Sequence, residues 1–281
     1  SLYDRDRALN TKSVQETQNT DFGRSYENYA SEQVSTSSRS VFIRQTYQLL
    51  AASLLAGTAG AYIGLHVLKT FSWLFLILEF ALLFGLIMSK KKPALALFML
   101  FGFTFVSGLT LGPTLNYYVG RGMGDVIAQA FLLTTAAFGG LSVFAMYSKR
   151  DFSVWGKFLF IALIVVVVAS LINLFTQSSV LALVISSVGA ILFSAYILYD
   201  TQMIIRGGYD SPVLAAVALY LDILNLFISS NPAKDLCIFF FVFSAESPIL
   251  STAPDVFLPC FSIFFIEAIE AFILLAAPKL A

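Results

Sequence analysis

The sequence has very little charge for its length. Only 12% of its 281 residues are Asp, Glu, Lys or Arg, whereas 58% are hydrophobic. Soluble domains carry roughly 25% charged residues, because charged side chains keep their surfaces hydrated. This deficit excludes an ordinary water-soluble domain and indicates that much of the outer surface faces lipid.

Cysteine, histidine and an excess of basic residues are also lacking. The two cysteines, Cys237 and Cys260, are far apart in the sequence, and the one histidine is His66. This pattern matches neither a disulfide framework nor a zinc site. The formal net charge is zero, so the chain offers no basic face to neutralise phosphates. We therefore expect no nucleic-acid partner and no resident cofactor.

Long apolar stretches fill the chain from Gln45 onward. Each is close to the roughly 20 residues that a helix needs to cross a bilayer, and short loops with Gly, Pro, Lys or Asp separate them. We expect an all-α membrane protein, a bundle of seven transmembrane helices. The expected spans are Gln45–Gly64, Phe71–Ser89, Pro93–Leu115, Val126–Tyr147, Val154–Phe175, Val180–Ile205 and Pro212–Ile228.

The two ends of the chain depart from this pattern. Residues 1–40 are polar and have no helical or alternating apolar period, so we expect a disordered tail before the transmembrane domain at 41–230. Residues 231–281 form an atypical hydrophobic extension. Its run from 256 to 277 is long enough for an eighth span but contains a proline and two glutamates, so an interfacial segment is the alternative.

Loop charges predict the orientation of the chain, because Lys and Arg are retained on the cytoplasmic side. One side of the bilayer has Lys69 and Arg121, and the side of the amino terminus has many more basic residues. The latter are Arg39, Arg44, Lys90, Lys91, Lys92, Lys149, Arg150, Lys157 and Arg206. We therefore expect the amino terminus in the cytoplasm.

Several glycines are spaced for close helix contacts. Gly60 and Gly64 form a GxxxG pair in the first span, and Gly139 and Gly140 are adjacent in the fourth. Small residues let helix backbones approach closely in lipid, where such packing holds helices together. We expect both sites to be packing positions.

Three acidic side chains fall inside the expected spans: Glu79, Asp200 and Asp222. Ionisable groups at membrane depth are costly and mark functional sites. At 1.5 Å per residue, Asp200 lies about 9 Å before Arg206 and Asp222 about 15 Å beyond Pro212. The short loop between the sixth and seventh spans makes these helices antiparallel neighbours. The two aspartates could therefore meet across the helix interface.

Two carboxyl groups in a dry site titrate as a pair. A shared proton would join the two helices, and its loss would leave two like charges. At about 4 Å and an effective dielectric near 20 these charges repel by about 4 kcal/mol. That approaches the roughly 5.5 kcal/mol that moves a two-state equilibrium from 1:99 to 99:1. We predict that Asp200 and Asp222 form a pH-sensing, gating pair.

The ionised pair would also attract a divalent cation. Calcium takes about six to eight oxygen ligands, and Asn225 is the nearest further oxygen donor on the helical face of Asp222. We therefore expect Asp200 and Asp222 to form a weak, transient calcium site, which suits passage better than storage. Glu79 and Asn225 are additional candidates for the ion pathway, although no partner for Glu79 is identifiable. Alternatively, each aspartate satisfies a hydroxyl or backbone group within the bundle.

Three motifs occur in order: SGLTLGPTLNYY at 107–118, ILFSAYILYDTQMIIRGGYDSP at 191–212 and AVALYLDILNLF at 216–227. Together they resemble the bacterial branch of the Bax inhibitor family, the transmembrane Bax inhibitor motif proteins. This resemblance implies a seven-helix fold with a central seventh helix, in a bacterial cytoplasmic (inner) membrane. It also implies a pH-dependent calcium leak gated by paired aspartates that match Asp200 and Asp222.

Three other functions are alternatives to this calcium channel. Tyr199 with Asp200 and the GMGD at 122–125 look like the two halves of an intramembrane aspartyl protease. Their order is reversed, and Asp125 suits the dipole at a helix start, so we expect no enzyme. A proton-coupled transporter also uses intramembrane acids, although no inverted repeat is visible. A non-conducting regulator that acts through unidentified partner proteins is the third alternative.

Overall fold

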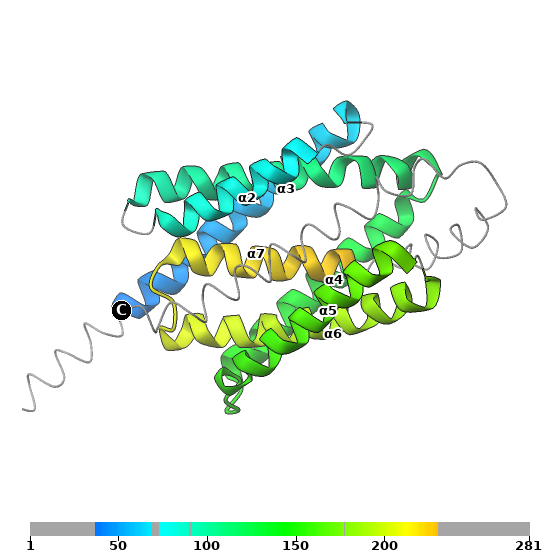
Figure 1. The fold of residues 1–281 in the computed structure, drawn as a ribbon. Helices are drawn as coiled ribbons and strands as arrows, with labels where there is room; N and C mark the ends of the chain where they lie inside the picture. Colours follow the sequence, from blue (N-terminus) through cyan, green and yellow to red (C-terminus); the bar gives the residue numbers. More distant parts are fainter. Residues whose placement is uncertain (1–36, 69–72, 90–91, 177, 230–281) are drawn as a thin grey trace, which may run out of the picture. The chain divides into compact units, whose positions relative to one another are not determined.

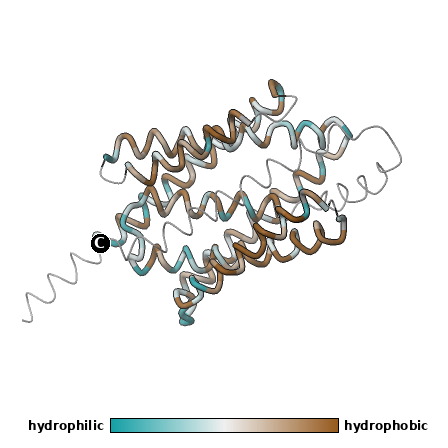
Figure 2. The backbone as a smooth tube through the Cα atoms, in the orientation of Figure 1, coloured by the Kyte–Doolittle hydropathy of each residue, from teal (hydrophilic) through white to brown (hydrophobic). Residues whose placement is uncertain are grey.

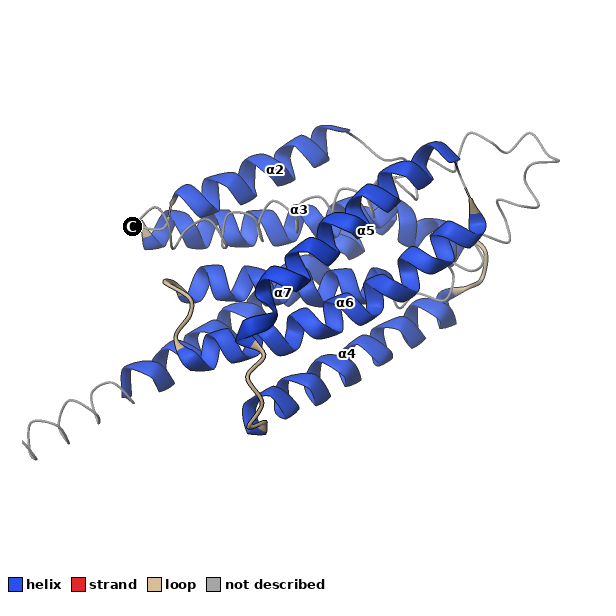
Figure 3. Ribbon diagram, turned by 60° about the horizontal axis from the view of Figure 1, so that its bottom comes forward, coloured by secondary structure: helices blue, strands red, loops and turns tan. Residues whose placement is uncertain are grey.

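The computed structural model describes residues 37–68, 73–89, 92–176 and 178–229. Every regular element in these ranges is a helix (Figure 3). The chain divides into two compact units, Ser1–Gln45 and Thr46–Ala281. Most of the expected polar tail and the hydrophobic extension from residue 231 lie outside the described residues. Residues 37–40, which we expected in the tail, are helical.

The described helices follow the expected apolar stretches closely. Six of them are long and apolar enough to cross a membrane, and α2 is a shorter apolar helix. The first helix begins at Ser37 rather than at Gln45, so it extends into the polar tail. The elements are the first helix (Ser37–Val67), α2 (Trp73–Met88), α3 (Pro93–Gly120), α4 (Gly124–Tyr147), the 3-10 turn η1 (Ser153–Trp155), α5 (Gly156–Thr176), α6 (Ser179–Arg206) and α7 (Pro212–Ser229).

Local sequence signals explain where the helices begin and end. Pro93 and Pro212 are the first residues of α3 and α7, where the missing proline N–H is not needed. Asp125 lies in the first turn of α4, at the positive end of the helix dipole. Gly207 ends α6 in the left-handed conformation, with φ of 77°, which glycine adopts without a steric penalty. These residues set the short loops of the bundle.

Helix α7 is the most enclosed of the described helices. Seventy-eight per cent of its span is buried, compared with 17% of the span of α4. It contacts α3, α4 and α6, and in Figure 1 it runs between the pair α2 and α3 and the group α4, α5 and α6. Its buried side chains therefore face other helices rather than lipid.

The first helix and α3 are in backbone contact at their glycines. A Cβ atom added to Gly60 would lie 2.0 Å from the carbonyl oxygen of Phe105, and one added to Gly108 would lie 2.0 Å from that of Gly57. The close approach expected at Gly60 is therefore present. The approach expected at the adjacent glycines of α4 is wrong, because a Cβ at Gly139 would meet no described atom within 4 Å.

Large apolar side chains cover the outer surface of the described helices. Phe131, Phe158 and Ile161 are among many that are more than half exposed. Figure 2 shows hydrophobic residues along most of each helix and hydrophilic residues gathered near the helix ends. This distribution is the one that a bilayer requires, because its hydrocarbon core accepts apolar surface and its boundaries accept polar groups.

Candidate functional site

The site begins with two buried aspartates on neighbouring helices. Asp200 lies in α6 with 5% of its surface exposed, and Asp222 lies in α7 with none exposed. Their carboxyl groups lie close enough to interact with each other. The structure thus brings together the two acids that helix spacing placed opposite each other. A hydrogen bond between two carboxyl groups requires that one of them carries a proton.

The short loop between α6 and α7 supplies a further partner. The hydroxyl of Tyr209 donates a hydrogen bond to Oδ1 of Asp200, over 2.8 Å. The loop is held by a bond from Gly208 N to the carbonyl oxygen of Met203, over 2.7 Å, so Tyr209 folds back over the end of α6. We did not predict this residue from the sequence. The sequence feature that could have identified it is a tyrosine in the short loop between the two helices that carry the aspartates.

Asn225, the other oxygen donor that we considered, is also buried in α7. Its side-chain Nδ2 donates to the backbone carbonyl oxygen of Leu221, over 2.9 Å. This bond leaves the amide oriented along its own helix. Whether Asn225 contributes to an ion pathway therefore stays a prediction.

Glu79 of α2 belongs to a different polar cluster. It is fully buried and accepts a hydrogen bond from the hydroxyl of Thr110 in α3, a partner that the sequence alone did not identify. One turn away on α3, Ser107 Oγ lies 2.7 Å from the hydroxyl of Tyr220 in α7. That hydroxyl also donates to the carbonyl oxygen of Thr104, over 3.1 Å. This cluster ties α2 and α3 to α7.

The two polar clusters lie on opposite sides of α7. Tyr220 and Asp222 are two residues apart, which corresponds to about 200° around a helix. Tyr220 faces α3 through its hydrogen bonds, and Asp222 faces α6 through Asp200. The structure therefore joins Asp200 with Asp222 and places Glu79 in the cluster on the α3 side.

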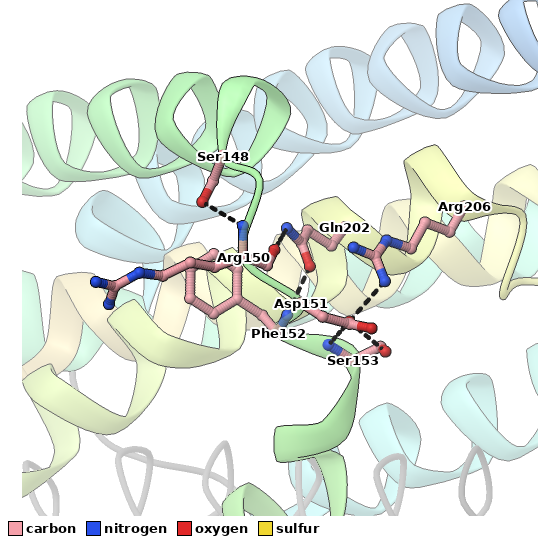
Figure 4. Close-up of polar contacts among 7 residues, drawn as sticks. All are labelled: Ser148, Arg150, Asp151, Phe152, Ser153, Gln202 and Arg206. Carbon is pink, nitrogen blue, oxygen red and sulfur yellow. Dashed lines mark hydrogen bonds and ion pairs between the residues drawn. The ribbon is translucent and has the colours of Figure 1, made fainter.

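A third polar cluster fastens the loop between α4 and α5 to α6 (Figure 4). Gln202 of α6 is buried. Its Oε1 accepts from the backbone N–H of Phe152, over 2.7 Å, and its Nε2 donates to the carbonyl oxygen of Arg150, over 2.7 Å. One side-chain amide thus satisfies two backbone groups of the loop.

An exposed ion pair lies beside this amide. Asp151 Oδ1 is 2.6 Å from Arg206 Nη1 at the end of α6. The same oxygen accepts from the backbone N–H of Ser153 over 2.9 Å and from its hydroxyl over 2.5 Å. These hydrogen bonds, from Ser153 first and Arg206 second, lower the pKa of Asp151 to about 2. The ion pair is therefore fully charged at neutral pH.

The described residues contain no group of three or more His, Cys, Asp or Glu side chains that could hold a metal ion. Asp200 and Asp222 provide two carboxyl groups. Calcium bound there would need hydroxyl, carbonyl or water oxygens to reach about six to eight ligands. A weak calcium site at this pair stays a prediction.

Known proteins are similar in sequence to most of this chain. Residues 39–229 match the family described as inhibitor of apoptosis-promoting Bax1. A relative from Campylobacter jejuni is 54% identical over 237 residues, 82% of this chain and 95% of that protein. A Vibrio cholerae protein described as a membrane protein is 40% identical over 66% of this chain and 85% of its own length.

Relatives also occur outside bacteria. A vaccinia virus protein named Golgi anti-apoptotic protein is 37% identical over 213 residues, 72% of this chain and 88% of that protein. The family match covers more than half of this chain. Six of the described helices are long and apolar enough to cross a membrane. The chain belongs to the Bax inhibitor family and is a helical, multi-pass membrane protein.

Proposed function

We propose that this protein is a pH-sensitive calcium leak channel in which Asp200 and Asp222 form the gate. One observation supports this proposal above the others: two buried carboxyl groups from consecutive helices lie close enough to interact with each other. A proton held between them joins α6 to α7. When it is lost, two negative charges face each other in an environment where they repel by several kcal/mol.

The position of α7 supports a route by which this local change would reach the rest of the bundle. Helix α7 is the most enclosed helix and contacts both α3 and α6. Its other side is held by the hydrogen bonds of Tyr220 to α3. Repulsion at Asp222 therefore acts at the α6–α7 interface, while the α3 side stays fastened. Separation of α6 from α7 would open a route lined by the two carboxylates.

The test is calcium flux into liposomes loaded with a calcium-sensitive dye, measured across a range of pH. We expect flux that depends steeply on pH in the natural sequence. The Asp200→Asn and Asp222→Asn variants should each conduct at a level that no longer responds to pH. Absence of flux at every pH would contradict the channel proposal.

A non-conducting regulator is the second candidate. The family description names inhibition of apoptosis-promoting Bax1, and the vaccinia relative is named for an anti-apoptotic activity. On this alternative, the aspartate pair sets the conformation of a surface that partner proteins recognise. The same liposomes separate the candidates, because a regulator without a pore gives no calcium flux.

We further propose seven crossings of a bacterial cytoplasmic membrane, with the amino terminus inside. Two observations support this proposal: most basic loop residues fall on the side of the amino terminus, and several relatives are bacterial. At 16 residues, α2 spans about 24 Å, so local bilayer thinning would accompany it. Thiol labelling of Lys149→Cys from inside and Arg121→Cys from outside, with Cys237 and Cys260 replaced by serine, tests this orientation.

A further inference from the structure

One face of α6 contacts the loop between α4 and α5, and the start of α5, at three successive points. Gln202 binds the backbone of residues 150 and 152, and Arg206 pairs with Asp151. Closer to the middle of α6, the hydroxyl of Tyr199 lies over Gly156 at the start of α5, where an added Cβ would be 2.7 Å from it. Tyr199, Gln202 and Arg206 are spaced i, i+3 and i+7, so they share one face of the helix.

Gln202 is the strongest of these attachments. Its two partners are a backbone donor and a backbone acceptor, so only one orientation of its amide satisfies both. The side chain is buried, and a buried backbone group that loses its partner is costly. The ion pair of Arg206 is about half exposed, and exposed pairs contribute little. The loop is therefore held to α6 chiefly through one amide.

This attached face determines where Asp200 points. At about 100° per residue, Asp200 lies about 100° to 160° around α6 from the attached side chains. Rotation of α6 about its axis would carry the Asp200 carboxyl away from Asp222. A helix fastened on one face cannot rotate freely, so the other face keeps its direction.

We propose that Gln202 is a positioning residue that sets the rotation of α6 and thereby keeps the Asp200 carboxyl against Asp222. This role deepens the gating pair of the proposed channel and rests on that function for its physiological meaning. Gln202 does not touch Asp222 or any ion. It acts through the helix, by fixing α6 to the loop that begins after α4 and ends in η1.

Other groups near Asp200 must be accounted for in a titration. Asp222 faces it from α7, Tyr209 from the α6–α7 loop, and Tyr199 precedes it in α6. From the first helix, the Tyr47 hydroxyl lies beside Thr201. Among these, Asp222 is the other carboxyl group. Two titration steps of a carboxyl pair in this region therefore report on Asp200 and Asp222 together.

The test replaces Gln202 by methionine, which keeps an unbranched side chain of similar length but removes both hydrogen bonds. The full-length protein is placed in nanodiscs, and the infrared band of protonated carboxyl groups is followed against pH. The Asp200→Asn spectrum identifies the contribution of the pair. We expect the two titration steps, which their interaction holds apart, to draw together by about one pH unit or more. Calcium flux should lose steepness with pH in parallel.

The matched control is the double variant Asp151→Asn with Arg206→Gln, which removes the exposed ion pair and leaves Gln202 intact. It should keep the separation of the titration steps. A Gln202→Met protein with the natural separation would overturn the proposal. The infrared titration does not require conduction, so a protein without flux whose steps still draw together upholds the positioning role and contradicts only the channel.

A second variant decides the matter if Gln202→Met does not accumulate in membranes. Gln202→Glu keeps an acceptor for the N–H of Phe152 but, when ionised, cannot donate to the carbonyl of Arg150. Near neutral pH, where the introduced carboxyl is ionised, we expect calcium flux to change less steeply with pH than in the natural protein. At acidic pH, where the introduced carboxyl is protonated and regains a donor, the flux should match that of the natural protein. Infrared titration steps of this variant with the natural separation would overturn the proposal.

Discussion

At the scale of single residues, Asp200 of the proposed gating pair contacts groups from two sides. Tyr209 donates to Asp200 from one side, and Asp222 contacts it from the other. A hydroxyl that donates to a carboxylate stabilises its charged form, whereas a shared proton stabilises the form of the pair that keeps one proton. On the proposed mechanism, we expect the balance between these two contacts to set the pH at which the pair releases its proton.

The Tyr209→Phe variant tests this balance. Without the hydroxyl, the ionised form of the pair loses a donor, so the pH midpoint of calcium flux should move upward, by about one unit or less. Flux against pH in liposomes measures it, with Tyr147→Phe, an exposed tyrosine at the end of α4, as the control. A midpoint that stays in place or moves downward would contradict the role given to Tyr209.

Calcium and protons should compete at the same two residues. Each carboxyl group attracts calcium only after it has lost its proton, so calcium affinity should rise as pH increases through the titration of the pair. Calcium titration of the purified protein at several pH values measures this dependence. The Asp222→Asn variant should bind more weakly and with a flatter pH dependence. Affinity that falls with increasing pH would exclude Asp200 and Asp222 as the calcium ligands.

Thr110 tests the second polar cluster. The Thr110→Val variant keeps the shape of the side chain but removes the donor to buried Glu79. An unsatisfied buried acceptor costs about 1–3 kcal/mol, so the unfolding temperature in detergent should fall. Glu79→Gln should change the unfolding temperature by less in the Thr110→Val background than it does in the natural protein. Strict additivity would show that the two side chains do not interact.

At the scale of elements, helix contacts in this bundle are of two kinds. The first helix and α3 are joined by backbone contact at glycines, whereas α6 is joined to α7 and to the α4–α5 loop by polar side chains. Close backbone packing makes a contact that tolerates little movement. Polar contacts that depend on protonation can change with pH. The α6–α7 interface is accordingly the element that we expect to move.

Gly60→Ala tests the rigid contact. A Cβ there would lie 2.0 Å from a backbone oxygen of α3, so the helices must separate and the unfolding temperature should fall. Gly139→Ala is the matched control in α4, where an added Cβ meets no described atom within 4 Å. Because alanine favours a helix over glycine by about 1 kcal/mol, the control should be neutral or slightly stabilising. Equal effects of the two changes would refute the contact.

The ion pair at the end of α6 should not contribute to pH sensing. Because its pKa is lowered to about 2, Asp151 adds to stability above the pKa of the unfolded chain, about 3.9, and this contribution is lost only as pH falls toward 2. Nothing in this pair therefore titrates near neutral pH. The Asp151→Asn variant should keep the pH midpoint of flux, and a shifted midpoint would show that the pair takes part in gating.

At the scale of the whole molecule, apolar length predicted the helices well because a bilayer requires a fixed run of apolar residues. The contact of Asp200 with Asp222 was also predictable, since a short loop forces adjacent antiparallel helices. The hydrogen bonds from Tyr209 to Asp200 and from Thr110 to Glu79 were not predictable. The contact of Gln202 with the α4–α5 loop was not predictable either. Those contacts depend on turn geometry and on helix rotation, which periodicity alone does not provide.

Calcium flux against pH in dye-loaded liposomes tests most directly whether one proton shared by Asp200 and Asp222 governs the passage of calcium. The natural protein should show a steep response to pH, and Asp200→Asn should show none, while Asp151→Asn retains the response. A natural protein that conducts equally at all pH values, or an Asp200→Asn variant with an unchanged response, would contradict this account.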